Sequence, residues 1–177
     1  VVLKLAATLD GGTAAPNGTS KWITSPEARA DGHRLRAESD AILIGAGTVR
    51  HDDPSLTVRE YHPEVPRGTS LDPRRVVLGS VPADAKVHPC KEYTGDLATL
   101  LDDLGADGAM QALVEGGAGL AGDFHRAGLV ARYVIYLAPA LFGGDDARGI
   151  FGGQGAFDIS EVWRGRFSSV ERIGADL

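Results

Sequence analysis

Three ionisable residues of the sequence could carry acid–base chemistry, namely Lys4, Asp52 and Glu115. Lys4 interrupts the apolar run VVLKLAATL, and Glu115 ends the apolar run ALVE. A charged group on a buried strand is unfavourable unless it is paired or functional. If the three side chains converge, they form a set that can transfer a proton and stabilise developing charge. A structural ion pair between Glu115 and Lys4 is the alternative interpretation.

Glycine turns follow three predicted strands, at residues 10–12, 45–48 and 115–117. Ligands of an open parallel sheet gather at the carboxyl ends of its strands, so these turns indicate one binding edge. Residues 117–122 also have the spacing G-x-G-x-x-G. A dinucleotide-binding fingerprint needs an acid at the end of the next strand, about 20 residues on, and that strand ends LAPA. What remains is a set of bare N–H groups at a helix N-terminus, which suits a pyrophosphate.

A basic stripe lies on the helix predicted for residues 25–38, where Arg29, His33 and Arg36 are spaced i, i+4, i+7. Such a stripe is most often a solvated face. Arg59 follows a compact turn and could join Arg36 on an anion. Two arginines from separate elements suit a phosphate monoester, because guanidinium binds it in a bidentate way.

Several classes of site are excluded by the motifs. The five histidines show neither H-x-x-x-H nor H-E-x-x-H spacing, so no metal site is expected. His88-Pro89-Cys90 resembles half of a zinc deaminase signature, but Tyr93 stands where its second cysteine is needed. The sequence also has no G-x-S-x-G elbow and no phosphate-binding P-loop.

Composition indicates one globular domain over residues 1–177. The net charge of −6 and the lack of a basic block argue against nucleic acid as a partner. Cys90 is the only cysteine, and no apolar stretch approaches the ~18 residues of a membrane span. We therefore expect a reducing, cytoplasmic setting. The start without methionine favours a piece of a longer polypeptide.

Apolar runs alternate with helical patterns, which predicts a three-layer α/β/α fold around a mostly parallel sheet. Expected strands cover residues 1–9, 41–44, 76–78, 110–114, 133–138 and 167–173. Expected helices cover residues 25–38, with Ser25 as N-cap and Pro26 next, 97–104 with a leucine stripe, and 120–128. The polar, proline-rich residues 61–73 are expected to form an exposed loop.

Three segments then identify a resemblance: KLAATLDGGTA, SKWITSPEARADGHRLRAESDAILIGAGTVRHDDPSLTVR, and LVEGGAGLAGDFHRAGLV with YLAPALFGG. They closely resemble the reductase domain of the bifunctional riboflavin-biosynthesis deaminase/reductase. The resemblance is weak over residues 60–111, except at RVVLGS, and after residue 151. It implies a dihydrofolate-reductase-like fold. It also implies the cofactor NADPH, which reduces the ribosyl group of 5-amino-6-(5-phosphoribosylamino)uracil at C1′ to a ribityl chain.

The resemblance also implies roles for individual residues. The expected cofactor contacts are Ala6, Trp22, Gly47, Thr48, Asp52, Ser80, Gly117, Ala118, Gly119, Leu120, Ala121, Gly122 and Asp123. The expected substrate contacts are Ser20, Arg36, Leu56, Arg59 and Glu115. Lys4 lies where the family has a lysine at the reaction centre, so Lys4, Asp52 or Glu115 is the expected proton donor. Gly79 replaces the family's usual acid before Ser80, which weakens the assignment of Ser80 to the cofactor.

Two other functions stay open at this point. A folate reductase of the same fold would also have Trp22 and a Gly-x-Thr turn, although the pair Arg36 and Arg59 and the motif VEGG favour the phosphorylated pyrimidine. A non-catalytic nucleotide-binding module would bind NADPH without turnover. The resemblance further implies a homodimer, and a fused deaminase domain is a possible partner.

Overall fold

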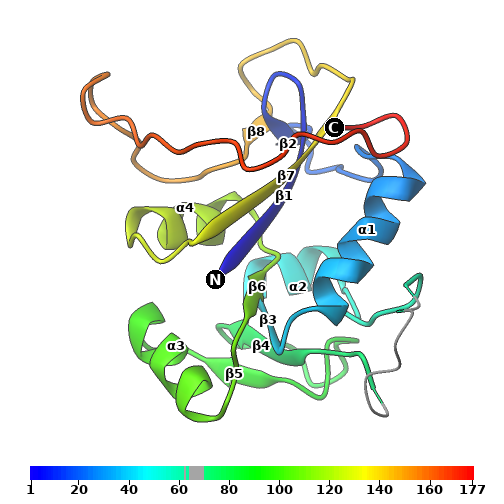
Figure 1. Cartoon of the computed structure of the whole chain (residues 1–177), viewed down its shortest axis with the longest axis vertical. Coiled ribbons are helices and arrows are strands. Elements are labelled where there is room, and N and C mark those ends of the chain that lie inside the picture. The colour runs from blue at the N-terminus through cyan, green and yellow to red at the C-terminus, as the bar shows by residue number, and fades with distance from the viewer. Residues whose placement is uncertain (62, 64–69) are drawn as a thin grey trace.

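The computed structural model describes residues 1–61, 63 and 70–177 (Figure 1). Its central sheet has the strand order β5-β4-β3-β6-β1-β7, and every neighbouring pair is parallel. The strands are β1 (Val2–Thr8), β3 (Ala41–Gly45), β4 (Arg74–Leu78), β5 (Lys91–Tyr93), β6 (Ala112–Val114) and β7 (Arg132–Ala138). The predicted parallel sheet is confirmed, and β1, the first strand of the chain, lies inside it between β6 and β7.

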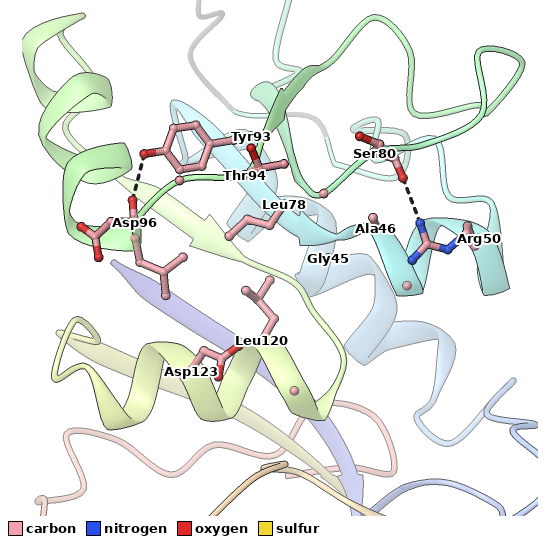
Figure 2. Close-up of a pocket in the computed structure, with 15 residues that line it drawn as sticks. Gly45, Ala46, Arg50, Leu78, Ser80, Tyr93, Thr94, Asp96, Leu120 and Asp123 are labelled. Atoms are coloured by element: carbon pink, nitrogen blue, oxygen red, sulfur yellow. Dashed lines mark hydrogen bonds between the residues drawn. The ribbon is translucent and has the colours of Figure 1, made fainter.

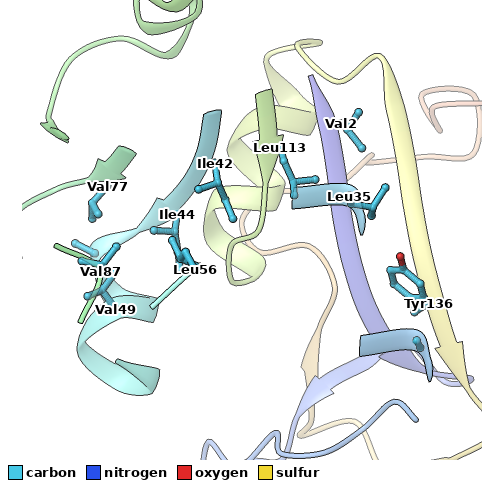
Figure 3. Packing of buried hydrophobic residues seen from close by; sticks show 12 residues of the cluster. Val2, Leu35, Ile42, Ile44, Val49, Leu56, Val77, Val87, Leu113 and Tyr136 are labelled. Carbon is cyan, nitrogen blue, oxygen red and sulfur yellow. The ribbon is translucent and has the colours of Figure 1, made fainter. Parts of the chain in front are cut away.

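Helices cover both faces of the sheet, which confirms the three-layer prediction. Figure 1 shows α1 (Pro26–Ala37) and α2 (Ala46–Asp52) on one side, with α3 (Leu97–Ala106) and α4 (Ala118–Arg126) on the other. Successive strand side chains alternate between two cores. Val2 packs with Leu35 of α1 (Figure 3), whereas Leu3 packs on the opposite face with Leu100 and Phe124.

The first helix begins as its sequence predicts. Ser25 is extended, and its hydroxyl accepts a hydrogen bond from the N–H of Ala28 at 3.3 Å. Pro26 follows at the first helical position, where its missing N–H would have no intrahelical partner. This cap sets the direction of α1, and with it the row of side chains that α1 presents to the sheet.

The strand predicted at residues 167–173 is wrong. This stretch contains no strand, and Phe167 is 92% and Val170 68% exposed, whereas Ile173 packs against the core on the α1 face. Leu177 instead pairs with the edge strand β7, and its N–H and C=O both form hydrogen bonds with Leu137. The apolar residues Phe167, Val170 and Ile173 are spaced three apart, so they do not give a strand one apolar face, which needs a spacing of two.

Four short elements were not expected from the sequence. They are α2, β5, and the antiparallel ribbon of β2 (Gly12–Ala14) with β8 (Arg148–Gly149). Each is too short to show a period. Of the predicted loop at 61–73, residues 62 and 64–69 lie outside the described residues. Within the residues described, no helix has the length and hydropathy to cross a membrane, and no cluster of three or more His, Cys, Asp or Glu could hold a metal ion.

Candidate functional site

Glu115 is the centre of a charged cluster on the α1 face of the sheet. Its carboxylate accepts two hydrogen bonds from Arg36, from Nε to Oε1 at 2.6 Å and from Nη2 to Oε2 at 2.9 Å. Lys4 Nζ lies 3.9 Å from Oε2. Lys4 is in the middle of β1, Glu115 directly follows the neighbouring β6, and Arg36 is in the last turn of α1. Three elements distant in sequence therefore bring one carboxylate and two cations together.

Glu115 is held in its ionised form. Its side chain is only 11% exposed, and this burial raises its pKa. The charge of Lys4 and the hydrogen bonds and charge of Arg36 outweigh burial, so the pKa lies below its ordinary value. An ionised carboxylate can accept a proton or orient a cation, but it has no proton to give. Of the predicted acid–base residues, Lys4 is the one that lies beside Glu115 and can donate a proton.

Lys4 is also supported from the other side, by residues that the sequence pattern did not single out. Its Nζ lies 5.7 Å from the ring centroid of Tyr136, a cation–π arrangement. The Tyr136 hydroxyl donates to Asp31 at 2.6 Å, and Arg34 in turn binds Asp31 with Nε–Oδ1 at 2.6 Å. Burial and the carboxylate of Asp31 raise the pKa of Tyr136, so its ring is neutral. Tyr136 lies beside Lys4 because β7 pairs with β1, and no signal in the sequence pointed to Tyr136.

Asp52, the third predicted member of the set, does not join this cluster. It ends α2, and in the described part of the chain no hydrogen bond or ion pair links it to Lys4 or Glu115. The geometry therefore favours a pair of Lys4 and Glu115, supplemented by Arg36, over the triad that the sequence suggested. Lys4 and Glu115 thus belong both to the predicted ion pair, which the structure contains, and to the predicted acid–base set, which stays a prediction.

The basic stripe of α1 is only partly a solvated face. His33 is buried, with Nδ1 3.0 Å from the carbonyl oxygen of Thr57, and Arg36 Nη1 donates to that oxygen at 3.1 Å. Burial, together with the charge of Arg36, lowers the pKa of His33. Arg29 instead stacks over the exposed ring of Trp22, 4.5 Å from its centroid.

Of the predicted substrate contacts, Arg36, Leu56 and Arg59 lie around one backbone segment, and Ser20 is not bonded to them. Arg36 and Arg59 both lie near Thr57: Arg36 donates to the Thr57 carbonyl oxygen, and the backbone N–H of Arg59 donates to His33 Nδ1 at 3.3 Å. Arg59 is exposed. Leu56, between them in the chain, is buried with a positive φ of 54°. Ser20 has no hydrogen bond to any of these residues within the described chain.

A cavity of about 700 Å³ opens at the carboxyl ends of β3 and β4 (Figure 2). Leu78 of β4 and Leu120 of α4 point toward one another across it. Its lining residues come from three strands, three helices and the turns beside them: Gly45, Ala46, Gly47, Arg50, Leu78, Gly79, Ser80, Tyr93, Thr94, Gly95, Asp96, Leu97, Gly119, Leu120 and Asp123. Five of the lining residues are glycines, which lets a ligand approach the backbone closely.

The predicted cofactor residues divide between this cavity and its surroundings. Those that line it are Gly47, Ser80, Gly119, Leu120 and Asp123. Thr48 and Gly117 are not among the lining residues, but the Gly117 N–H donates to Thr48 Oγ1 at 3.3 Å and so joins two of the three predicted glycine turns. The remaining ones lie away from the lining: Ala6, Trp22, Asp52, Ala118, Ala121 and Gly122.

Gly122 and Ala121 face the protein interior rather than the cavity. Ala121 is fully buried in the core, and a Cβ on Gly122 would lie 2.0 Å from the carbonyl oxygen of Gly152. The Gly152 N–H also donates to the Ala118 carbonyl at 2.7 Å. The C-terminal segment therefore crosses the first turns of α4, and Gly122 is required for that crossing.

Comparison with known proteins gives one consistent result. The family model described as RibD C-terminal domain matches residues 1–177. The chain is 40% identical over 187 residues to the riboflavin biosynthesis protein RibD of Mycobacterium tuberculosis, covering 100% of this chain and 52% of that protein.

Solved structures agree with that match. A structure described as Acinetobacter baumannii RibD, form 1, has a TM-score of 0.89 and 32% identity over 99% of this chain and 55% of its own. The Thermotoga maritima diaminohydroxyphosphoribosylaminopyrimidine deaminase/5-amino-6-(5-phosphoribosylamino)uracil reductase has a TM-score of 0.79 and 27% identity, over 99% and 54%. The chain thus spans about half the length of these relatives.

Proposed function

Because the chain belongs to the RibD C-terminal domain family, we propose that it reduces 5-amino-6-(5-phosphoribosylamino)uracil in riboflavin biosynthesis. The name of the Thermotoga maritima relative includes this reductase activity. The observation that carries the proposal is the path of one segment. Glu115 of the charged cluster is followed within four residues by Gly119 of the cavity wall. A proton-handling site and a ligand cavity are thereby joined through a single turn.

NADPH is the proposed cofactor, and the residues present fit an extended dinucleotide. The cavity is within the ~300–1,000 Å³ typical of small-molecule sites, and its glycine-rich wall suits a ligand that lies close to backbone. The N-cap of α4, Gly117, has no side-chain cap, so the N–H groups of the first helical residues, 118–120, are available to a pyrophosphate. When bound, the reduced nicotinamide would supply a hydride.

Lys4 is the proposed proton donor. Reduction at C1′ adds a hydride to the carbon and leaves an electron pair on the neighbouring atom, which must then receive a proton. The Lys4 ammonium carries protons, and the ionised Glu115 at 3.9 Å and the Tyr136 ring hold it in place. Glu115 would stabilise positive charge and contact the substrate, while Arg36 keeps Glu115 ionised and oriented.

The substrate phosphate is assigned mainly to Arg59. Arg36 commits three N–H groups to Glu115 and Thr57, which leaves it two of its five donors. Arg59 is exposed beside the same backbone segment. The two guanidinium groups together would contact an anion from one side, with Arg59 supplying most of the contact.

The decisive experiment is turnover of the deaminated pyrimidine intermediate by this chain, followed as NADPH oxidation, with NADH and dihydrofolate as comparisons. We expect reduction of the phosphorylated pyrimidine, and turnover about 10²- to 10⁴-fold slower in the variant Lys4→Met. Turnover of dihydrofolate alone would establish a folate reductase instead. Binding of NADPH without any turnover would establish a non-catalytic nucleotide-binding module.

Three further properties stay predictions. A fused deaminase domain in the full-length protein and a homodimeric state are implied by the family, and a cytoplasmic location is expected from the single cysteine. The first is supported by the name of the Thermotoga maritima relative, which includes a deaminase activity, and by the share of that protein which this chain covers.

A further inference from the structure

Arg50 of α2 lies at the rim of the cavity, on the side away from α4 (Figure 2). Its Nη1 donates to the carbonyl oxygen of Ser80 at 2.9 Å, which fixes the direction of the guanidinium. That bond uses one of the five N–H donors of the group. Among the residues that the structure describes, no carboxylate forms an ion pair with Arg50. The rim therefore holds a cation that is oriented but not neutralised.

Two acidic residues line the cavity. Asp123 is paired with Arg126 at 2.6 Å, and Asp96 caps α3, accepts from the Thr99 N–H at 2.9 Å and lies across the cavity from Arg50 (Figure 2). No other lysine, arginine or histidine lines the cavity. An anionic group that enters from this side thus meets one positive charge, that of Arg50.

The Ser80 side chain adds a second donor at the same place. Ser80 is exposed, and within the described chain its hydroxyl makes no hydrogen bond to another residue. A guanidinium and a hydroxyl on the α2–β4 side form a corner suited to a phosphate monoester. The proposed pyrophosphate position, at the first turn of α4, is on the other side of the cavity, next to Gly119 and Leu120.

We propose that Arg50, with the Ser80 hydroxyl, binds the 2′-phosphate of the adenosine ribose and so selects the phosphorylated dinucleotide over the unphosphorylated one. This inference rests on the proposed function, since it assumes that the cavity holds the adenosine half of the cofactor. The apolar side chains of Leu78, Tyr93 and Leu97 offer contact area for an adenine ring. The 2′-phosphate is the one group that distinguishes the two dinucleotides, so the position of Arg50 decides between them.

The test is direct binding of NADP⁺ and NAD⁺, measured by isothermal titration calorimetry. In Arg50→Ala we expect NADP⁺ to bind about 10- to 100-fold more weakly, as for loss of a charged hydrogen bond. NAD⁺ affinity should change by less than about twofold, because it lacks the contacting group. Arg50→Gln removes the charge but keeps a donor for Ser80, and it should show the same loss. Arg74→Ala, at the opposite end of β4, is the matched control and should bind both ligands as the wild type does.

Two other outcomes would overturn the assignment. An equal loss for both dinucleotides would show that Arg50 contacts a shared group or only supports the fold. An unchanged NADP⁺ affinity would exclude any contact, and if the wild type still reduced the pyrimidine the proposed function would stand. A wild-type protein that bound neither dinucleotide would instead refute the proposed function, and this inference with it. Binding of 2′,5′-ADP and 5′-AMP repeats the comparison without the nicotinamide half.

Discussion

Removal of Arg36 should destabilise the protein through Glu115. Arg36→Ala deletes two hydrogen bonds to a carboxylate that is 11% exposed, and a third to Thr57. Removing one partner of a buried ion pair costs about 3–5 kcal/mol. Because Lys4 stays 3.9 Å from the carboxylate, we expect the lower end of this range, about 3 kcal/mol.

A double-mutant cycle isolates the pair itself. Glu115→Gln leaves Arg36 buried without its carboxylate, so it should also lose about 3 kcal/mol. In the double variant neither charge is left buried without its partner. Its loss should therefore be smaller than the sum of the single losses by about 2 kcal/mol. Urea unfolding at pH 7, with unchanged m-values, gives the three differences.

The pH dependence supplies an independent check on the same interaction. The folded-state pKa of Glu115 lies below its ordinary value of 4.5. The stabilisation is therefore fully present above pH ~4.5 and is lost as the pH falls through the folded-state value. The gap between wild type and Glu115→Gln should shrink in that acidic range. Strictly additive losses in the cycle, or a gap that is constant with pH, would refute the reasoning.

Three further changes test separate parts of the molecule. Lys4→Met should reduce turnover about 10²- to 10⁴-fold, as for loss of a general acid, while calorimetry shows unchanged NADP⁺ affinity; a smaller effect on turnover would exclude Lys4 as proton donor. Arg59→Ala should lower kcat/KM for the phosphorylated substrate about 10- to 100-fold without changing the urea midpoint, and an unaffected KM would remove Arg59 from the phosphate site. Gly122→Ala forces a Cβ against the carbonyl of Gly152 and should destabilise by about 1–3 kcal/mol in urea unfolding. Gly119→Ala on the same helix, with open space around it, should not, and equal effects would contradict the crossing described above.

The layers of the fold could be predicted because they depend on local patterns. Apolar runs gave the buried strands, and Ser25 followed by Pro26 gave the start of α1. The seven residues of α2 bury only Ala46 and Val49, too few to show a helical period after a glycine turn. The strand predicted at 167–173 had weak local support, because its apolar residues Phe167, Val170 and Ile173 are spaced three apart, and Leu177 instead pairs with Leu137 of β7.

The candidate site could be predicted only in part from the sequence, because its contacts join residues that are distant along the chain. Lys4 and Glu115 stood out because charge is rare inside apolar strands, and the structure brings them together. Arg36 lies closer to Glu115 than Lys4 does. This arrangement depends on how α1 packs on the sheet, because Arg36 and Glu115 are 79 residues apart in the sequence. The order of partners around one buried acid is thus a property of the packed layers.

The interior place of β1 has a consequence for biosynthesis. β1 pairs only with β6 and β7, so Val2 finds its neighbours at Leu113 and Arg132, which the ribosome adds more than a hundred residues later. Until then the first strand has no hydrogen-bonding partner, and its apolar side chains are available to chaperones or to aggregation. Contacts this distant along the chain also slow folding. Lys4 belongs to this strand, so its contact with Glu115 cannot form until β6 has been synthesised, more than a hundred residues after Lys4.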